Sequence, residues 1–158
     1  MSETNTGNNT GNSTGNSTGN TTAPVVTTSV INQVVESVIT LMNATSPFAT
    51  VTRGALPTGK GLVCEVGPSA PSAVFLDKNT VIPLDVTLNG KHANLKTLSD
   101  AMNKIHSALT RATSYPSGDD WQIVDITNMT LPQKIGREEN NEWLMASSLS
   151  VYFYQKGD

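Results

Sequence analysis

Reactive side chains are scarce in this sequence. It has one cysteine, Cys64, so no disulfide can form within the chain and no cluster of thiolates can hold a metal. Cys64 stands between Leu62 and Val66, and a lone cysteine among apolar residues is typical of a small buried hydrophobic side chain. We therefore expect a protein made in a reducing compartment, with no catalytic role for the thiol.

Basic runs and long apolar runs are missing as well. The formal net charge is −3 and the ten Lys and Arg residues stand singly along the chain, which argues against a general attraction to nucleic-acid phosphates. No apolar run approaches the ~20 residues that cross a bilayer, and the first residues lack the basic and apolar regions of a secretion signal. We expect protein partners, with no membrane and no specific nucleic-acid binding.

Motifs for catalysis, cofactor binding or metal binding are not found either. His92 and His106 lack the spacing of a metal site and are expected to be structural. Gly59–Gly61 lacks the long glycine frame and following Ser/Thr of a phosphate loop, so it is expected to be a turn. Asp119 and Asp120 stand in a Pro/Gly/Ser-rich stretch, where adjacent carboxylates usually form a solvated turn. The sequence therefore predicts no enzyme, no cofactor and no metal.

What is present begins with a low-complexity tail. Residues 4–22 contain almost only Thr, Asn, Gly and Ser, and the triplet TGN recurs every four residues, at Thr6, Thr10, Thr14 and Thr18. Such a repeat has no apolar position to bury and cannot offset the entropy cost of ordering. We predict a disordered tail over residues 1–24 and a single α+β domain over residues 25–158, since a chain of 158 residues suits one core.

The sequence after the tail predicts a helix, three strands, a second helix and two further strands, in that order. Apolar pairs from Val30 to Met42 recur every three to four residues and indicate a helix that ends before Pro47, with Thr28 or Ser29 as its cap. Asn94 is the expected cap of a second helix. The predicted strands are residues 62–66, 73–76, 82–89, 121–129 and 143–154, with a parity shift between Ile123 and Val124 that indicates a bulge or burial on both faces. Together these predict an antiparallel sheet of about five strands with both helices on one face.

The terminal strand gives the clearest pattern. The odd-numbered residues Trp143, Met145, Leu149, Val151 and Phe153 are apolar. The even-numbered residues Ser148, Ser150, Tyr152 and Tyr154 are serines and tyrosines. One face should be buried and the other free for water or a neighbouring chain. Tyrosines favour interfaces because they combine apolar contact with an exposed hydroxyl. The preceding turn carries mixed charges suited to ion pairs around a closed ring. The predicted interface residues are Arg137, Glu138, Glu139, Trp143, Tyr152 and Tyr154.

Several segments carry a resemblance to a known family. They are Val81–Gly90 (VIPLDVTLNG), the helix through Leu95–Ala112, Trp121–Ile126 (WQIVDI), Leu131–Glu138 (LPQKIGRE) and the last strand, which runs from Trp143–Met145 into Leu149–Tyr154. In element order, over roughly residues 28–156, the chain resembles the tail terminator proteins of long-tailed bacteriophages, often labelled minor capsid proteins in Gram-positive phages.

The resemblance implies a structural virion protein made in the cytoplasm of a host bacterium. It implies a homohexameric ring at the junction of tail and neck, which caps the tail tube, stops polymerisation of the tube protein and presents a surface for joining the head. Its partners would be other copies of itself, the tube protein and a neck or head-completion protein. Such a role needs a heterologous self-interface whose rotation closes, and no active site.

Three alternatives remain open at this stage. The chain could be another neck or head–tail connector of similar shape. It could be a surface-binding or glycan-binding module on a Thr-rich stalk, which the Asn-x-Ser/Thr sequons in the tail suggest. It could also be a small enzyme that uses Asp119, Asp120 or His106.

Overall fold

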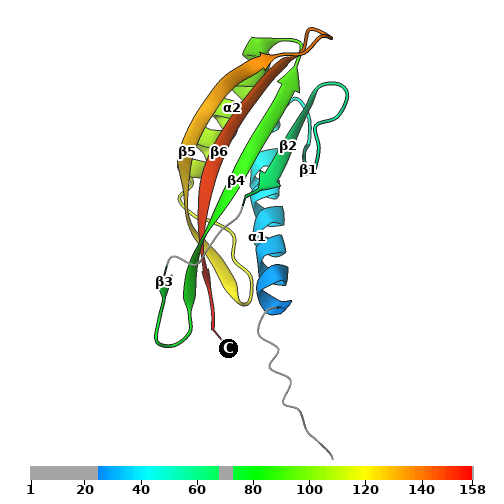
Figure 1. The fold of residues 1–158 in the computed structure, drawn as a ribbon. Coiled ribbons are helices and arrows are strands. Elements are labelled where there is room, and N and C mark those ends of the chain that lie inside the picture. Colours follow the sequence, from blue (N-terminus) through cyan, green and yellow to red (C-terminus); the bar gives the residue numbers. More distant parts are fainter. Residues whose placement is uncertain (1–24, 68–72, 158) are drawn as a thin grey trace, which may run out of the picture.

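The computed structural model describes residues 25–67 and 73–157, and Figure 1 shows their arrangement. The elements in chain order are α1 (Val25–Asn43), β1 (Val51–Arg53), β2 (Gly61–Val66), β3 (Ala73–Val74), β4 (Thr80–His92), α2 (Leu95–Thr110), β5 (Trp121–Arg137) and β6 (Trp143–Gln155). The predicted order of helix, three strands, helix and two strands is confirmed, with the three-residue β1 as an addition. The disordered tail predicted over residues 1–24 lies outside the described residues.

The sheet is mostly antiparallel and has its longest strands in the middle. The strand order is β1-β2-β4-β6-β5, and the short β3 pairs with the start of β4. Only β1 and β2 run parallel among the described pairs; β4 and β6 pair without interruption from Thr80↔Gln155 to His92↔Trp143. In β6 the predicted alternation holds in part. Met145, Leu149, Val151 and Phe153 are buried, whereas Trp143 is only half-buried. Ser150, predicted on the open face, is buried as well, because its hydroxyl donates a hydrogen bond to Asp85 of the neighbouring β4. Strand β5 has β6 on one side only and forms one edge of the sheet.

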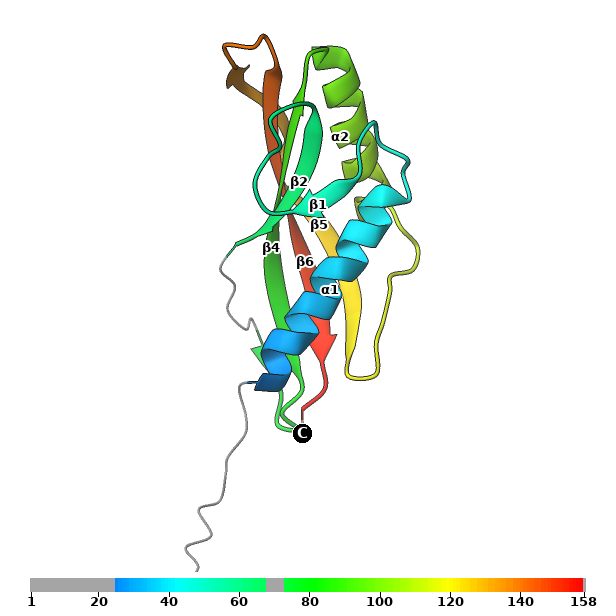
Figure 2. The same ribbon diagram turned by 90° about the vertical axis from the view of Figure 1, so that its right-hand side faces the viewer.

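Both helices cover the same face of the sheet, as predicted (Figure 2). The cap of α2 is confirmed, because Asn94 Oδ1 accepts a hydrogen bond from the Thr97 N–H at 3.1 Å. The cap predicted for α1 at Thr28 or Ser29 is wrong, since α1 already begins at Val25. The pair Val25/Val26 continues the apolar repeat by one more turn, and Thr and Ser are tolerated inside a helix that this repeat supports.

The core lies between the helices and the sheet. From α1 it takes Val34, Val38 and Met42, and from α2 Leu98, Met102, Ile105 and Leu109, all at most 2% exposed. Helix α2 approaches β4 so closely at Gly90 that a Cβ there would lie 2.6 Å from Leu98 Cδ1. Glycine is therefore required for this packing of α2 on the sheet.

Cys64 behaves as predicted. Its side chain is fully buried in the core, and burial raises the pKa of the thiol to about 11. A neutral thiol without solvent access is a packing residue, because nucleophilic chemistry requires an accessible thiolate.

Candidate assembly surfaces

The six predicted interface residues fall into two groups at opposite ends of β6. Arg137, Glu138, Glu139 and Trp143 lie at the turn between β5 and β6, whereas Tyr152 and Tyr154 lie near the C-terminal end of β6. Nine to eleven strand residues separate Trp143 from the tyrosines, which corresponds to roughly 30–36 Å. The structure therefore does not bring the six residues together into one patch.

At the turn, two cations flank one indole ring. The Arg137 guanidinium lies 4.8 Å from the Trp143 ring centroid, and Lys134 Nζ lies 5.2 Å from it. Contacts of this kind stabilise by about 0.5–1 kcal/mol at exposed sites. Trp143 and Arg137 are thus held by each other within one chain, which keeps the half-buried indole in place at this end of the sheet.

Glu138 takes part in an ion pair inside the chain. Its Oε2 lies 3.2 Å from Lys91 Nζ, and Glu142 Oε2 lies 3.7 Å from the same nitrogen. The Lys91 side chain is only 5% exposed. Glu139 is exposed beside Arg137 and Asn140, around a shallow hollow. Of the charges predicted for intersubunit ion pairs, Glu138 thus already has a partner in its own chain.

At the other end of β6, an apolar turn stands out from the molecule. Phe75 is 51% exposed and Leu76 fully so, and with Asp77, Asn79 and Tyr154 they surround a surface hollow. We call Phe75, Leu76 and Asp77 the hairpin tip. A strand was predicted through Leu76, but β3 ends at Val74. The turn includes Leu76 and is closed by the hydrogen bond from the Lys78 N–H to the Phe75 carbonyl, so Phe75 and Leu76 lie in the β3–β4 connection.

Strand β5 carries four further exposed apolar side chains. They are Val124, Met129, Leu131 and Ile135, each at least 50% exposed, and we call them the β5 apolar row. Every one lies at a break in the pairing of β5 with β6: these breaks fall between Ile123/Asp125, Asn128/Thr130, Thr130/Gln133 and Lys134/Gly136. The parity shift predicted at Ile123/Val124 is thus a bulge.

Bulges in an edge strand have two effects here. They interrupt the hydrogen-bonding edge, which opposes open-ended strand addition, and they turn apolar side chains outward. The β5 apolar row was missed by sequence analysis because spacings of five, two and four residues fit neither a strand nor a helix period.

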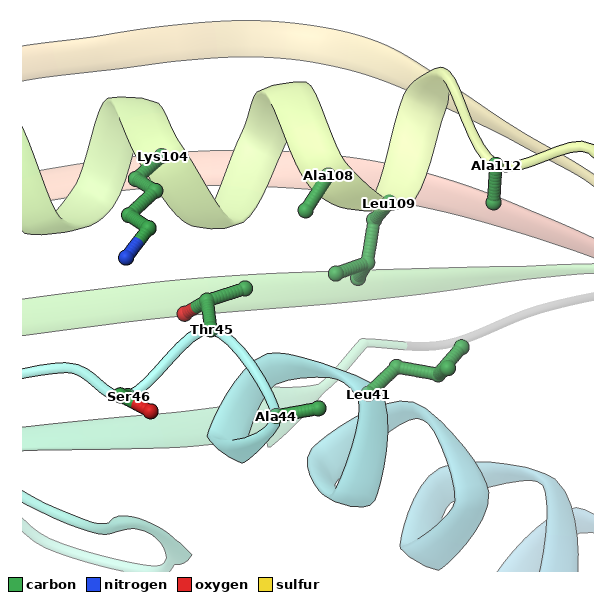
Figure 3. A pocket seen from close by; sticks show the side chains of 8 residues that line it. All are labelled: Leu41, Ala44, Thr45, Ser46, Lys104, Ala108, Leu109 and Ala112. Carbon is green, nitrogen blue, oxygen red and sulfur yellow. The ribbon is translucent and has the colours of Figure 1, made fainter.

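A cavity of about 390 Å³ lies between the two helices (Figure 3). We call it the helix cavity. Its walls are Leu41, Ala44, Thr45 and Ser46 from the end of α1 and the residues after it, and Lys104, Ala108, Leu109 and Ala112 from α2 and just beyond. The Thr45 hydroxyl donates to the Met42 carbonyl at 2.7 Å, so its hydrogen bond is already made within the chain. The helix cavity is therefore mainly aliphatic, with Lys104 as its one charged lining residue.

The buried His106 joins α2 to two strands. Its Nε2 lies 2.7 Å from Ser147 Oγ and its Nδ1 lies 2.7 Å from Asn128 Oδ1. Burial lowers the pKa of His106, and the hydrogen bond to Asn128 opposes this shift in part. The Ser–His–Asn geometry resembles that of a nucleophile and its base, but Ser147 is 3% exposed and lines none of the described pockets. Since a substrate cannot reach Ser147 Oγ, the cluster acts structurally, as a hydrogen-bonded core histidine.

The remaining candidate residues have local structural roles. His92 Nδ1 accepts a hydrogen bond from the Asn94 N–H at 2.8 Å, and its ring meets Phe48 edge-on at 4.7 Å. Asp119 and Asp120 are exposed, and their backbone carbonyls accept hydrogen bonds from Lys156. Among residues 25–67 and 73–157, no group of three or more His, Cys, Asp or Glu is placed to hold a metal ion.

Comparison with known proteins gives a structural match. The sequence matches no family model and no curated protein. The fold is similar to a chain in the solved structure "Virion of native gene transfer agent (GTA) particle", with a TM-score of 0.52 and 12% sequence identity; the match covers 75% of this chain and 92% of that chain. At this identity the similarity establishes a shared fold. Neither helix in the described ranges is long and apolar enough to cross a membrane.

Proposed function

We propose that this chain is a structural protein of a phage-like virion and acts as its tail terminator. In this role copies of the chain form a ring, of six subunits if it follows the family, that caps the tail tube and ends polymerisation of the tube protein. The ring then offers a surface to the neck or head-completion protein. The work is done by shape and self-association at the junction of tail and neck.

The observation that carries this proposal is the fold match to a virion chain over 92% of that chain's length. The resemblance of the sequence to tail terminators over roughly residues 28–156 supports the finer role. A second support is the exposed apolar surface at the hairpin tip and the β5 apolar row. Exposed large apolar side chains are candidates for surfaces that partners cover in the assembled state.

The polar chemistry supports an assembly role as well. The buried polar side chains His106, Ser147 and Lys91 are all used in hydrogen bonds or ion pairs within the chain. Buried polar groups that are fully hydrogen-bonded within the chain stabilise one fold. A protein that assembles through its surface needs such a stable fold.

Polymerisation of the tube protein tests the function directly. Purified chain is added to tube protein during assembly, and tube lengths are measured by negative-stain electron microscopy. We expect tubes that stop growing and carry a ring at one end. Tubes of unchanged length without end density would contradict the terminator role. Full heads with separate tails of normal length, in preparations that lack the chain, would instead favour a role in head–tail joining.

A further inference from the structure

The hairpin tip is a turn closed by hydrogen bonds. The Phe75 N–H donates to the Asn79 carbonyl at 2.9 Å and the Lys78 N–H to the Phe75 carbonyl at 3.0 Å. Asp77 Oδ1 accepts from the Asn79 N–H at 3.2 Å and closes the turn. Leu76 lies in the turn that these bonds close, and its side chain is fully exposed. Burial of an exposed leucine side chain is favourable, which makes Leu76 suitable as an apolar anchor.

The helix cavity has the properties of a receptor for such an anchor. Figure 3 shows Lys104, Ala108 and Leu109 of α2 directed toward Ala44 and Thr45 at the end of α1. The small side chains of Ala44, Ala108 and Ala112 leave the space open. Its volume of about 390 Å³ falls within the range of ~300–1,000 Å³ that is usual for binding pockets.

The charges of the two surfaces are complementary. Asp77 follows Leu76 directly in the hairpin tip, and Lys104 lines the helix cavity. Lys104 is exposed and forms no ion pair with any residue of the described ranges. An acidic group beside the anchor and an unpaired ammonium beside the cavity favour one register of docking and disfavour others.

We propose that Leu76 of one copy of this chain inserts into the helix cavity of the next copy, with Asp77 facing Lys104. The β3–β4 connection lies at one end of the molecule, below the level at which α1 ends (Figures 1 and 2). The two surfaces are therefore different patches, and their contact is heterologous, which forms a closed ring when the rotation closes. The inference deepens the proposed function and rests on it, because it names the contact between neighbouring subunits of the ring.

Cysteine cross-linking of the full chain tests this contact. The buried Cys64 is shielded in the folded protein. We expect the variant Leu76→Cys/Ala108→Cys to form, on mild oxidation, a ladder of linked multimers on denaturing gels. A mixture of Leu76→Cys and Ala108→Cys single variants should stop at dimers that contain one of each.

The control double variant places its second cysteine on α2 but away from the helix cavity. Lys96 is exposed and twelve residues from Ala108, which is about 18 Å along the helix. We expect Leu76→Cys/Lys96→Cys to give no ladder. Equal ladders from both double variants would overturn the docking of Leu76 in the helix cavity.

A second measurement uses charge and needs no cross-link. In sedimentation velocity, Lys104→Glu should weaken self-association roughly fivefold, because it places a carboxylate opposite Asp77. Adding Asp77→Asn should recover most of this loss, since asparagine keeps the oxygen that the Asn79 N–H uses. Identical association of all three proteins would contradict the Asp77–Lys104 pairing.

Substitution of the anchor separates this inference from the proposed function. Leu76→Asp should abolish multimers, whereas Thr52→Asp at another exposed position should leave them intact. Multimers that persist in Leu76→Asp would overturn the contact while leaving ring formation standing. A wild-type chain that is monomeric at every concentration, alone and with tube protein, would overturn the ring itself.

Discussion

Lys91 Nζ and Glu138 Oε2 lie 3.2 Å apart and join the end of β4 to the turn between β5 and β6. The ammonium is nearly inaccessible to water, and it also contacts the Thr58 carbonyl and Glu142. A buried cation of this kind depends on its acidic partners, because leaving it unpaired costs more than the pair contributes. The position of the Arg137–Trp143 end of the sheet therefore depends on this ion pair.

Removal of both acids should destabilise the fold. We expect Glu138→Gln/Glu142→Gln to lower the free energy of unfolding by roughly 1–3 kcal/mol, because Lys91 stays buried without a counter-charge. Adding Lys91→Met should recover most of the loss, since methionine fills the space without a charge. Urea denaturation followed by circular dichroism measures both. Equal stability of wild type and the double variant would show that the ion pair has no structural role.

The buried His106 predicts a dependence of stability on pH. Burial holds its pKa in the folded chain below the ordinary 6.5, so below pH 6.5 the unfolded chain binds a proton that the folded chain does not. Stability should therefore be fully present above pH 6.5 and fall as the pH drops toward the folded pKa, by up to about 1.4 kcal/mol per pH unit.

Denaturation midpoints between pH 7.5 and 5.5 test this dependence. His106→Gln should flatten the curve in that range. A wild-type stability that rises on acidification would contradict a neutral His106 in the core.

The close packing at Gly90 can be tested by adding one methyl group. Gly90→Ala would place a Cβ 2.6 Å from Leu98 Cδ1 and 2.9 Å from Leu62 Cδ2, and both side chains are buried in the core, so they must shift. We expect a loss of about 1–3 kcal/mol in unfolding free energy. Gly59→Ala, where nothing lies within 4 Å, is the matched control and should change little. A thermal scan in which both variants melt with wild type would disprove the contact.

The β5 apolar row should matter for assembly and little for folding. Met129 and Leu131 are more than half exposed, so Met129→Glu/Leu131→Glu should leave the melting temperature nearly unchanged. We expect the variant to lose tube capping or ring formation, because carboxylates would be desolvated in the contact. Thr127→Glu, at an exposed non-apolar position of the same strand, is the control. Normal capping by the double variant would exclude this row from the assembly surfaces.

The sequence predicted the helices and strands well where the spacing of apolar residues matches the residues that are buried. In β6 the alternate apolar residues Met145, Leu149, Val151 and Phe153 are all buried. Asn94 caps α2 because its side chain can replace a missing backbone partner. Helix α1 begins before the predicted caps Thr28 and Ser29 because the apolar repeat continues to Val25 and Val26. The short β1 carries no pattern of its own; Val51 is fixed there by Asn43, whose side chain bonds both its N–H and its carbonyl.

The assembly surfaces were harder to predict from sequence. Phe75 and Leu76 read as strand residues, and only the turn formed in three dimensions exposes them. Met129 and Ile135 are exposed by bulges, which depend on the pairing of β5 with β6. Ion pairs such as Lys91–Glu138 join residues 47 positions apart, which no local pattern reveals. Surface chemistry singled out Arg137 and Trp143; the structure shows a contact between them within one chain, and their role in an interface stays a prediction.

The most direct test of the account is the tail length of particles assembled without this chain. Deletion of its gene should give heads accompanied by tail tubes of uncontrolled, excessive length, and the wild-type gene supplied separately should restore a single length. Particles whose tails keep their normal, uniform length after the deletion would contradict the proposed terminator role.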